Sequence, residues 1–180
     1  MFVQTEITPN PNSLKFLPGK TVSNHGSFEV NKKEETNNEL LRNLLSIKGV
    51  EGIFLGKDFI SINKYKDVSW DEIKHIAISL INDFYSTGKE FVIENGLLGE
   101  KKEERTEIEK QIISILESKI RPAVAKDGGD IKFKEFKNGI VKVELQGSCS
   151  GCPSSTMTLK QGVKNLLCHY LPEVKEVVAI

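Results

Sequence analysis

Two cysteines with a C-x-x-C spacing, Cys149 and Cys152, are the residues of this chain best suited to chemistry. The residues between them, Ser150 and Gly151, are small, so the backbone can curl tightly and both thiols can face one point. Pro153 suits the first position of a helix, where its missing N–H costs no hydrogen bond. Because a helix N-terminus favours negative charge, we expect a lowered thiol pKa. Thiolates bind metal ions, hold iron–sulfur clusters or attack disulfides, and the motif predicts one of these chemistries.

A third cysteine, Cys168, lies 16 residues beyond Cys152 on the helix expected after the motif, with His169 next to it. At 1.5 Å per residue this is roughly 24 Å, whereas the ligands of one metal lie ~2–2.3 Å from it. A continuous helix therefore excludes both residues from a site with Cys149 and Cys152 in the same chain. Helical periodicity also places Cys168 off the apolar stripe of that helix.

One chain thus supplies two thiolates, and three chemistries stay open. A cluster or metal shared between two chains would obtain the four thiolates that iron–sulfur clusters usually require, and a two-fold dimer supplies that symmetry. A thioredoxin-like dithiol is the second, although one helix and one strand after the motif are too little for the rest of such a fold. A structural zinc shared between chains is the third.

The other candidate residues favour structural roles. Asp127-Gly128-Gly129-Asp130 predicts a tight turn, because paired glycines tolerate unusual backbone angles and aspartates bond neighbouring N–H groups. Acid–base catalysis by the two carboxylates is disfavoured, since no nucleophile or base accompanies them. His75 lies on an expected helix without a second ligand four residues later, so we expect no metal there.

Composition excludes several classes of function. The chain carries 25 basic and 25 acidic residues, a net charge of +0, without the basic excess of nucleic-acid-binding proteins. No apolar run approaches the ~20 residues of a membrane span. The N-terminus lacks the features of a signal or transit peptide, and three cysteines suit a reducing compartment. We expect a cytoplasmic protein, or a mature organellar one of the mitochondrial matrix.

Apolar periodicity predicts an α+β protein of two small domains. Residues 1–88 are expected to form a ββαββα domain, in which residues 8–13 make a turn between two edge strands and residues 25–37 a polar surface connection. Partner binding is the alternative role of that turn. The expected strands and helices are residues 2–8, 14–17, 38–47, 50–55, 59–63 and 69–88.

Residues 89–105 lose this periodicity and predict a linker, and residues 106–180 predict a second domain. Its expected order is αββαβ with a three-stranded mixed sheet: a helix that ends around Arg121-Pro122, a hairpin turning at Asn138-Gly139, the cysteine motif, a helix and a last strand. The crossover after the motif predicts that the last strand runs parallel to the second hairpin strand.

These motifs resemble those of a known family. Residues 127–130, 145–160 and 172–174 are similar to the C-terminal domain of NifU-like (Nfu) iron–sulfur cluster proteins, and residues 1–6 and 8–16 resemble the Nfu N-terminal domain. The resemblance implies a scaffold or carrier, not an enzyme, that holds a cluster between two subunits of a homodimer. The cluster is usually [4Fe–4S], with [2Fe–2S] as the alternative.

The same resemblance places the cluster ligands on Cys149 and Cys152 and gives Cys168 no role. It implies apo iron–sulfur client proteins and cluster-assembly proteins as partners, with neither nucleic acid nor membrane. The first domain contains no cysteine, which is consistent with partner docking or regulation.

Overall fold

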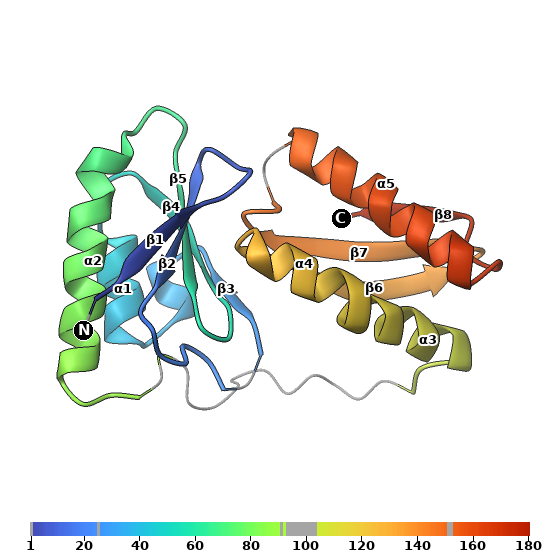
Figure 1. Cartoon of the computed structure of the whole chain (residues 1–180), viewed down its shortest axis with the longest axis horizontal. Coiled ribbons are helices and arrows are strands. Elements are labelled where there is room, and N and C mark those ends of the chain that lie inside the picture. Colours follow the sequence, from blue (N-terminus) through green and yellow to red (C-terminus); the bar gives the residue numbers. More distant parts are fainter. Residues whose placement is uncertain (1, 25, 91, 93–103, 151–152) are drawn as a thin grey trace. The chain divides into compact units, whose positions relative to one another are not determined.

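The structure is a computed structural model of the 180-residue chain. It describes residues 2–24, 26–90, 92, 104–150 and 153–180, with no description of the side chains of residues 153–155. The chain divides into two compact units, Met1–Leu97 and Leu98–Ile180 (Figure 1). Both units combine helices with a sheet, so the predicted α+β class is confirmed.

The first unit is built on a five-stranded sheet in which every neighbouring pair is antiparallel, in the order β1-β2-β5-β4-β3. Helices α1 and α2 contribute their apolar residues to one continuous core with the sheet. The elements are β1 (Gln4–Ile7), β2 (Ser13–Leu17), β3 (Phe28–Val30), the 3₁₀ turn η1 (Lys33–Glu35), α1 (Glu39–Leu45), β4 (Val50–Leu55), β5 (Ile60–Lys64) and α2 (Trp70–Ser86).

Two expectations for this unit are wrong. The segment 25–37, expected to be a surface connection, contains the edge strand β3, which pairs with β4 from Phe28 to Val30. Three residues are too few to show an alternating pattern, so the sequence did not predict this strand. Strand β2 is not an edge strand either, because it lies between β1 and β5.

The helices of the first unit begin where polar caps predict. The Asn38 side chain accepts a hydrogen bond from the N–H of Leu41 (3.2 Å), and the Ser69 hydroxyl accepts one from the N–H of Asp71 (3.3 Å). Each bond satisfies a donor that the first helical turn leaves without a partner. Ser69 is therefore the N-cap of α2.

The second unit has the predicted mixed three-stranded sheet in the order β6-β7-β8. Strands β6 and β7 form an antiparallel hairpin that turns at Asn138 (φ 53°) and Gly139 (φ 79°), and β8 runs parallel to β7, both as predicted. The elements are α3 (Glu107–Ile115), η2 (Leu116–Ile120), α4 (Arg121–Lys126), β6 (Gly129–Lys137), β7 (Ile140–Gly147), α5 (Pro153–Tyr170) and β8 (Glu176–Ala179).

One face of this sheet carries the core. Ile131 on β6 lies opposite Leu145 on β7, and both join a buried cluster that includes Ile112 from α3 and Val163 from α5. Both helical segments therefore cover the same face (Figure 1). No helix in the described part of the chain has the length and apolar character to cross a membrane.

The first helix of this unit does not end at Arg121-Pro122 as expected. It passes through one π turn, η2, and continues as α4 to Lys126. The N–H of Arg121 donates to the carbonyl of Leu116, five residues back, and Pro122 lies in the first turn of the new segment, where proline is tolerated. The wider turn lets the helix pass a proline that would otherwise break it.

The buried tyrosine of the first unit predicts a dependence of stability on alkaline pH. Burial raises the pKa of Tyr85 to about 12, from the ordinary value of about 10. The folded state thus holds this proton more tightly, and the contribution to stability is complete below about pH 10 and lost as pH rises through about 12. As pH rises from about 10 through about 12, we expect the free energy of unfolding of the native protein to fall by up to about 2–3 kcal/mol more than that of Tyr85→Phe.

Urea titrations between pH 9 and 12, followed by the fluorescence of Trp70, measure this difference, because the chain's single tryptophan belongs to the first unit. Tyr65→Phe is the matched control, since the Tyr65 side chain is 54% exposed. A Tyr85→Phe protein with the same pH dependence as the native chain would contradict the prediction.

Candidate functional site

The first motif cysteine, Cys149, follows the end of β7 and is buried, with 6% of its surface exposed. It belongs to the apolar core of the second unit. Helix α5 begins at Pro153, as the sequence predicts. Cys152, the other predicted ligand, lies outside the described residues, so the described site consists of Cys149 and the segments around it.

The turn that follows β7 is closed by glycine and serine. Gly147 has a positive φ of 66°, a conformation that glycine adopts without steric cost. Its carbonyl accepts hydrogen bonds from the N–H (3.2 Å) and the hydroxyl (2.8 Å) of Ser150. On the other side, the Thr156 hydroxyl in α5 donates to the carbonyl of Cys149 (3.1 Å). These bonds fix the backbone of Cys149 between the strand and the helix.

The thiol lies directly against the backbone of Gly129. A Cβ atom at this position would lie 2.6 Å from the Cys149 Sγ and 2.6 Å from the carbonyl oxygen of Gln146, both too close for real atoms. Gly129 is also the cross-strand partner of Gly147. Only a residue without a side chain leaves room for the thiol here.

The residues before Gly129 bond to the cysteine loop as well. The N–H of Ser148 donates to the carbonyl of Gly128 (3.2 Å), and its hydroxyl donates to the carbonyl of Asp127. The segment 127–129, predicted as a plain turn, therefore forms the wall of the cysteine site. Sequence analysis missed this role. The signal available in the sequence was the second glycine of the pair, Gly129. One glycine suffices for the turn, so a second glycine indicates that another group approaches the backbone closely.

The expected lowering of the thiol pKa is wrong for Cys149. The pKa of Cys149 is raised to about 11, chiefly by burial and to a lesser extent by the carboxylates of Asp127 and Asp130, while a hydrogen bond with Ser148 acts in the opposite direction. The sequence argument considered only the helix N-terminus. It could not foresee that the thiol lies in the core, where desolvation penalises the charged form.

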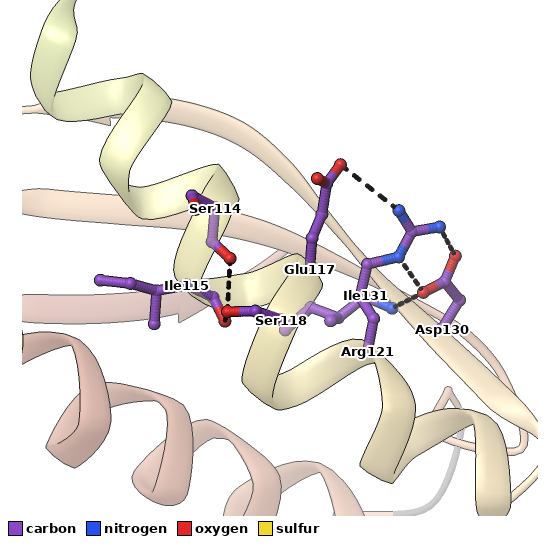
Figure 2. A network of polar contacts seen from close by, with 7 residues as sticks. All are labelled: Ser114, Ile115, Glu117, Ser118, Arg121, Asp130 and Ile131. Atoms are coloured by element: carbon purple, nitrogen blue, oxygen red, sulfur yellow. Dashed lines mark hydrogen bonds and ion pairs between the residues drawn. The ribbon is translucent and has the colours of Figure 1, made fainter.

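Of the two aspartates of the turn, Asp127 is exposed and Asp130 is buried. The carboxylate of Asp130 accepts two hydrogen bonds from the Arg121 guanidinium, each 2.8 Å long, and one from the N–H of Ile131 (2.8 Å) (Figure 2). A carboxylate with these partners is a structural anchor.

The third cysteine is a core residue. Cys168 is half-buried and packs against the apolar cluster of the second unit, and its thiol donates to the carbonyl of Val174 (3.1 Å). The expectation that it points off the apolar stripe is wrong, because the turn after α5 folds back over it. Helix α5 is continuous from Pro153 to Tyr170, as the distance argument against Cys168 requires.

The histidines offer no metal site within the described residues. His75 lies exposed on α2, and His169 lies exposed in the last turn of α5. Across the described ranges, no three His, Cys, Asp or Glu side chains gather in a way that could hold a metal ion.

Comparison with known proteins defines the class. Residues 3–88 match the family "Scaffold protein Nfu/NifU N terminal", and residues 112–178 match the "NifU-like domain". A two-unit protein with these domains in this order is a NifU-like protein of the Nfu type. The solution NMR structure of a NifU-like protein from Saccharomyces cerevisiae aligns at 29% identity, covering 52% of this chain and 85% of its own, with a TM-score of 0.48.

Full-length relatives support the same conclusion. NifU-like protein 4, mitochondrial, from Arabidopsis thaliana is 44% identical over 184 residues, covering 98% of this chain and 65% of the relative. The NFU1 iron-sulfur cluster scaffold homolog, mitochondrial, from Homo sapiens is 43% identical over 180 residues, covering 98% of this chain and 71% of the relative. The chain belongs to the NifU-like (Nfu) family, and it spans about two thirds of the length of these relatives.

The contact between Cys149 and Gly129 predicts the effect of adding one methyl group. Gly129→Ala places a Cβ 2.6 Å from both the Cys149 Sγ and the Gln146 oxygen. One of them must move, and we expect a loss of about 1–3 kcal/mol in the free energy of unfolding. Thermal and urea denaturation, followed by circular dichroism, measure the loss.

Gly162→Ala in α5 is the matched control. A Cβ at Gly162 meets nothing within 4 Å, so alanine should stabilise the helix by up to about 1 kcal/mol. Equal stability changes in the two variants would show that the close approach at Gly129 carries no strain.

Proposed function

We propose that this protein is an iron–sulfur cluster scaffold and carrier that binds its cargo through the thiolates of Cys149 and Cys152. The observation that carries the proposal is the position of Cys149. Cys149 follows the end of β7, a few residues before α5 and the second cysteine, and its thiol lies against the backbone of Gly129. The human relative's name, iron-sulfur cluster scaffold homolog, supports the same role.

The donor set fits this cargo. Iron–sulfur clusters are held by cysteine thiolates, most often four. The C-x-x-C motif supplies two per chain, so two chains together complete the set in a cluster-bridged homodimer. We assign a [4Fe–4S] cluster to the four-thiolate site, with [2Fe–2S] as the alternative outcome of the loading experiment below.

The raised pKa of Cys149 has a consequence for loading. A thiol with a pKa of about 11 stays protonated near neutral pH when the protein is empty, which limits its oxidation. Ligand binding requires the thiolate, so uptake of a cluster releases this proton. A buried, protonated thiol is compatible with an empty metal-binding site, whereas attack on a disulfide requires the thiolate.

The dithiol alternative is therefore disfavoured. A thioredoxin-like nucleophile needs a thiolate near neutral pH, whereas burial opposes the thiolate form of Cys149. A zinc ion shared between chains would use the same ligands, and metal analysis of the loaded protein distinguishes it.

The remaining parts of the proposal concern partners and location. We assign delivery of the cluster to apo iron–sulfur proteins, with no catalytic step of the protein's own, and partner docking to the first unit, whose sequence contains no cysteine. Both named relatives are mitochondrial proteins. We therefore place this protein in the mitochondrial matrix, and the expectation of a cytoplasmic protein finds no support in these names.

Loading should require both motif cysteines. After anaerobic reconstitution with iron and sulfide, we expect Cys149→Ala and Cys152→Ala to retain less than about a tenth of the native iron, because each removes two of four ligands from a shared site. Iron and sulfide analysis, together with the visible absorption spectrum, measures the loss.

Cys168→Ala is the matched control. It removes a thiol that contacts the core and Val174, and it should load as the native chain does. Normal iron content in either motif variant would refute the assignment of the ligands.

The oligomeric state should follow the cluster. Because one chain supplies two motif thiolates, we expect the empty protein to be monomeric and the loaded protein to be a dimer with about four irons per two chains. Light scattering under anaerobic conditions, before and after chelation, measures the change. A loaded protein that stays monomeric would exclude a cluster shared between subunits.

A further inference from the structure

We propose that Arg121 and Asp130 are positioning residues of the cysteine site: their ion pair holds the glycine wall against which Cys149 is seated. The inference rests on the proposed function, because it assigns these residues a part in retaining the cluster. In the empty protein, the same pair controls access to the Cys149 thiol.

The wall is held on its β7 side by the Ser148 hydrogen bonds to Asp127 and Gly128 and by the pairing of Gly129 with Gly147. It consists of residues 127–129, between the short helix α4 and the first residue of β6. On the α4 side, the N–H groups of Asp127 and Gly128 donate to the carbonyls of Val124 and Ala125, each at 3.1 Å. Helix α4 is the last, six-residue part of the helix that continues through the π turn. The placement of the wall therefore also depends on what fixes α4.

The ion pair fixes both ends of this segment. Arg121 is the first residue of α4, and Asp130 directly follows the wall, nine residues later. The Nε and Nη2 of Arg121 donate to the two carboxylate oxygens of Asp130 at 2.8 Å each. Bidentate pairs of this kind are strong and fix orientation as well as distance. The pair thus closes α4 and the wall into one loop.

Burial increases what the pair contributes. The side chain of Asp130 is 7% exposed and that of Arg121 is 35% exposed. A carboxylate this deeply buried is destabilised if its partner is removed. Glu117, 3.7 Å from the other terminal nitrogen of Arg121, adds a weaker and more exposed contact.

The π turn supplies the geometry on the helix side. It ends at Ile120, immediately before Arg121, and the Ser118 hydroxyl donates within it to the carbonyls of Ser114 (2.8 Å) and Ile115 (3.5 Å). One extra residue in the turn changes the direction in which the next side chains leave the helix. Figure 2 shows Arg121 reaching from this point to Asp130, with Glu117 on its other side.

The chain of contacts from the pair to the thiol is short. Asp130 follows Gly129 in sequence, and Gly129 is the residue on which the Cys149 Sγ lies. Loss of the pair would let the wall move away and expose the thiol, without removing any apolar contact of the core. This effect is distinct from a general loss of stability.

The test uses full-length protein with Asp130→Asn, Arg121→Gln and the double variant. The matched control is Glu135→Gln, which breaks an exposed pair with Lys142 (2.8 Å) on the same hairpin. The first readout is the alkylation rate of Cys149 by iodoacetamide in the empty protein at fixed pH. A Cys152→Ala background and peptide mass mapping separate the Cys149 signal from Cys168. The second readout is the rate of iron loss from loaded protein, with both cysteines intact, to excess chelator.

We expect both single variants to accelerate alkylation and iron loss by about tenfold, and the control to change neither. The double variant should lie closer to the native protein than Arg121→Gln, because it leaves no buried carboxylate without its partner. If the two residues acted on the Cys149 thiol only through their charges, the two single variants would change the alkylation rate in opposite directions. The Asp130 carboxylate raises the pKa of Cys149, so a charge effect would accelerate alkylation in Asp130→Asn and slow it in Arg121→Gln.

Three results would overturn the proposal. They are rates within about twofold of the native protein, opposite effects of the two single variants, and an acceleration no larger than the measured global unfolding equilibrium accounts for. If the native protein takes up no cluster, the proposed function fails, whereas the alkylation of the empty protein still decides whether the pair positions Cys149.

Discussion

The close contact between the Cys149 thiol and the backbone of Gly129 is the constraint on which the second unit's site depends. It requires glycine at the first position of β6 and a turn at Gly147 that places Cys149 next to it. It also requires that the wall, residues 127–129, keeps its position after the end of α4. Three segments that are separate in sequence, 121–130, 145–149 and 153–156, therefore meet at one thiol. Moving any of them moves the Cys149 thiol.

This placement combines two properties that a carrier needs. Burial keeps the Cys149 thiol neutral, with a pKa of about 11, so the empty site carries no reactive thiolate at this residue. The thiol nevertheless belongs to a residue in the loop between the end of β7 and the start of α5. Under the proposed function, a cluster would then be bound and released at this edge of the core, to which Cys149 itself belongs.

The sequence predicted the parts of the fold that strong local signals specify. The hairpin at Asn138-Gly139 and the parallel β8 follow from residue types and connection rules. It did not predict β3, which is too short for a pattern, or the continuation of the first helix through Pro122, which a π turn permits. For the site, it identified Cys149 as the residue at the end of a strand. It missed the wall, which arises from a contact between residues 20 positions apart, and the direction of the pKa shift, which arises from burial of the thiol in the core.

The site is held mainly by backbone groups, and this has a consequence for how it works when empty. The hydrogen bonds that shape the loop are accepted by backbone carbonyls, those of Asp127, Gly128, Gly147 and Cys149. Their donors are Ser148, Ser150 and Thr156 of the same chain. The shape around Cys149 therefore does not require a bound metal. A preorganised ligand loses little conformational freedom on binding. Under the proposed function, release of a cluster would then leave the loop folded, and the loaded and empty states would differ mainly in the thiols and their protons.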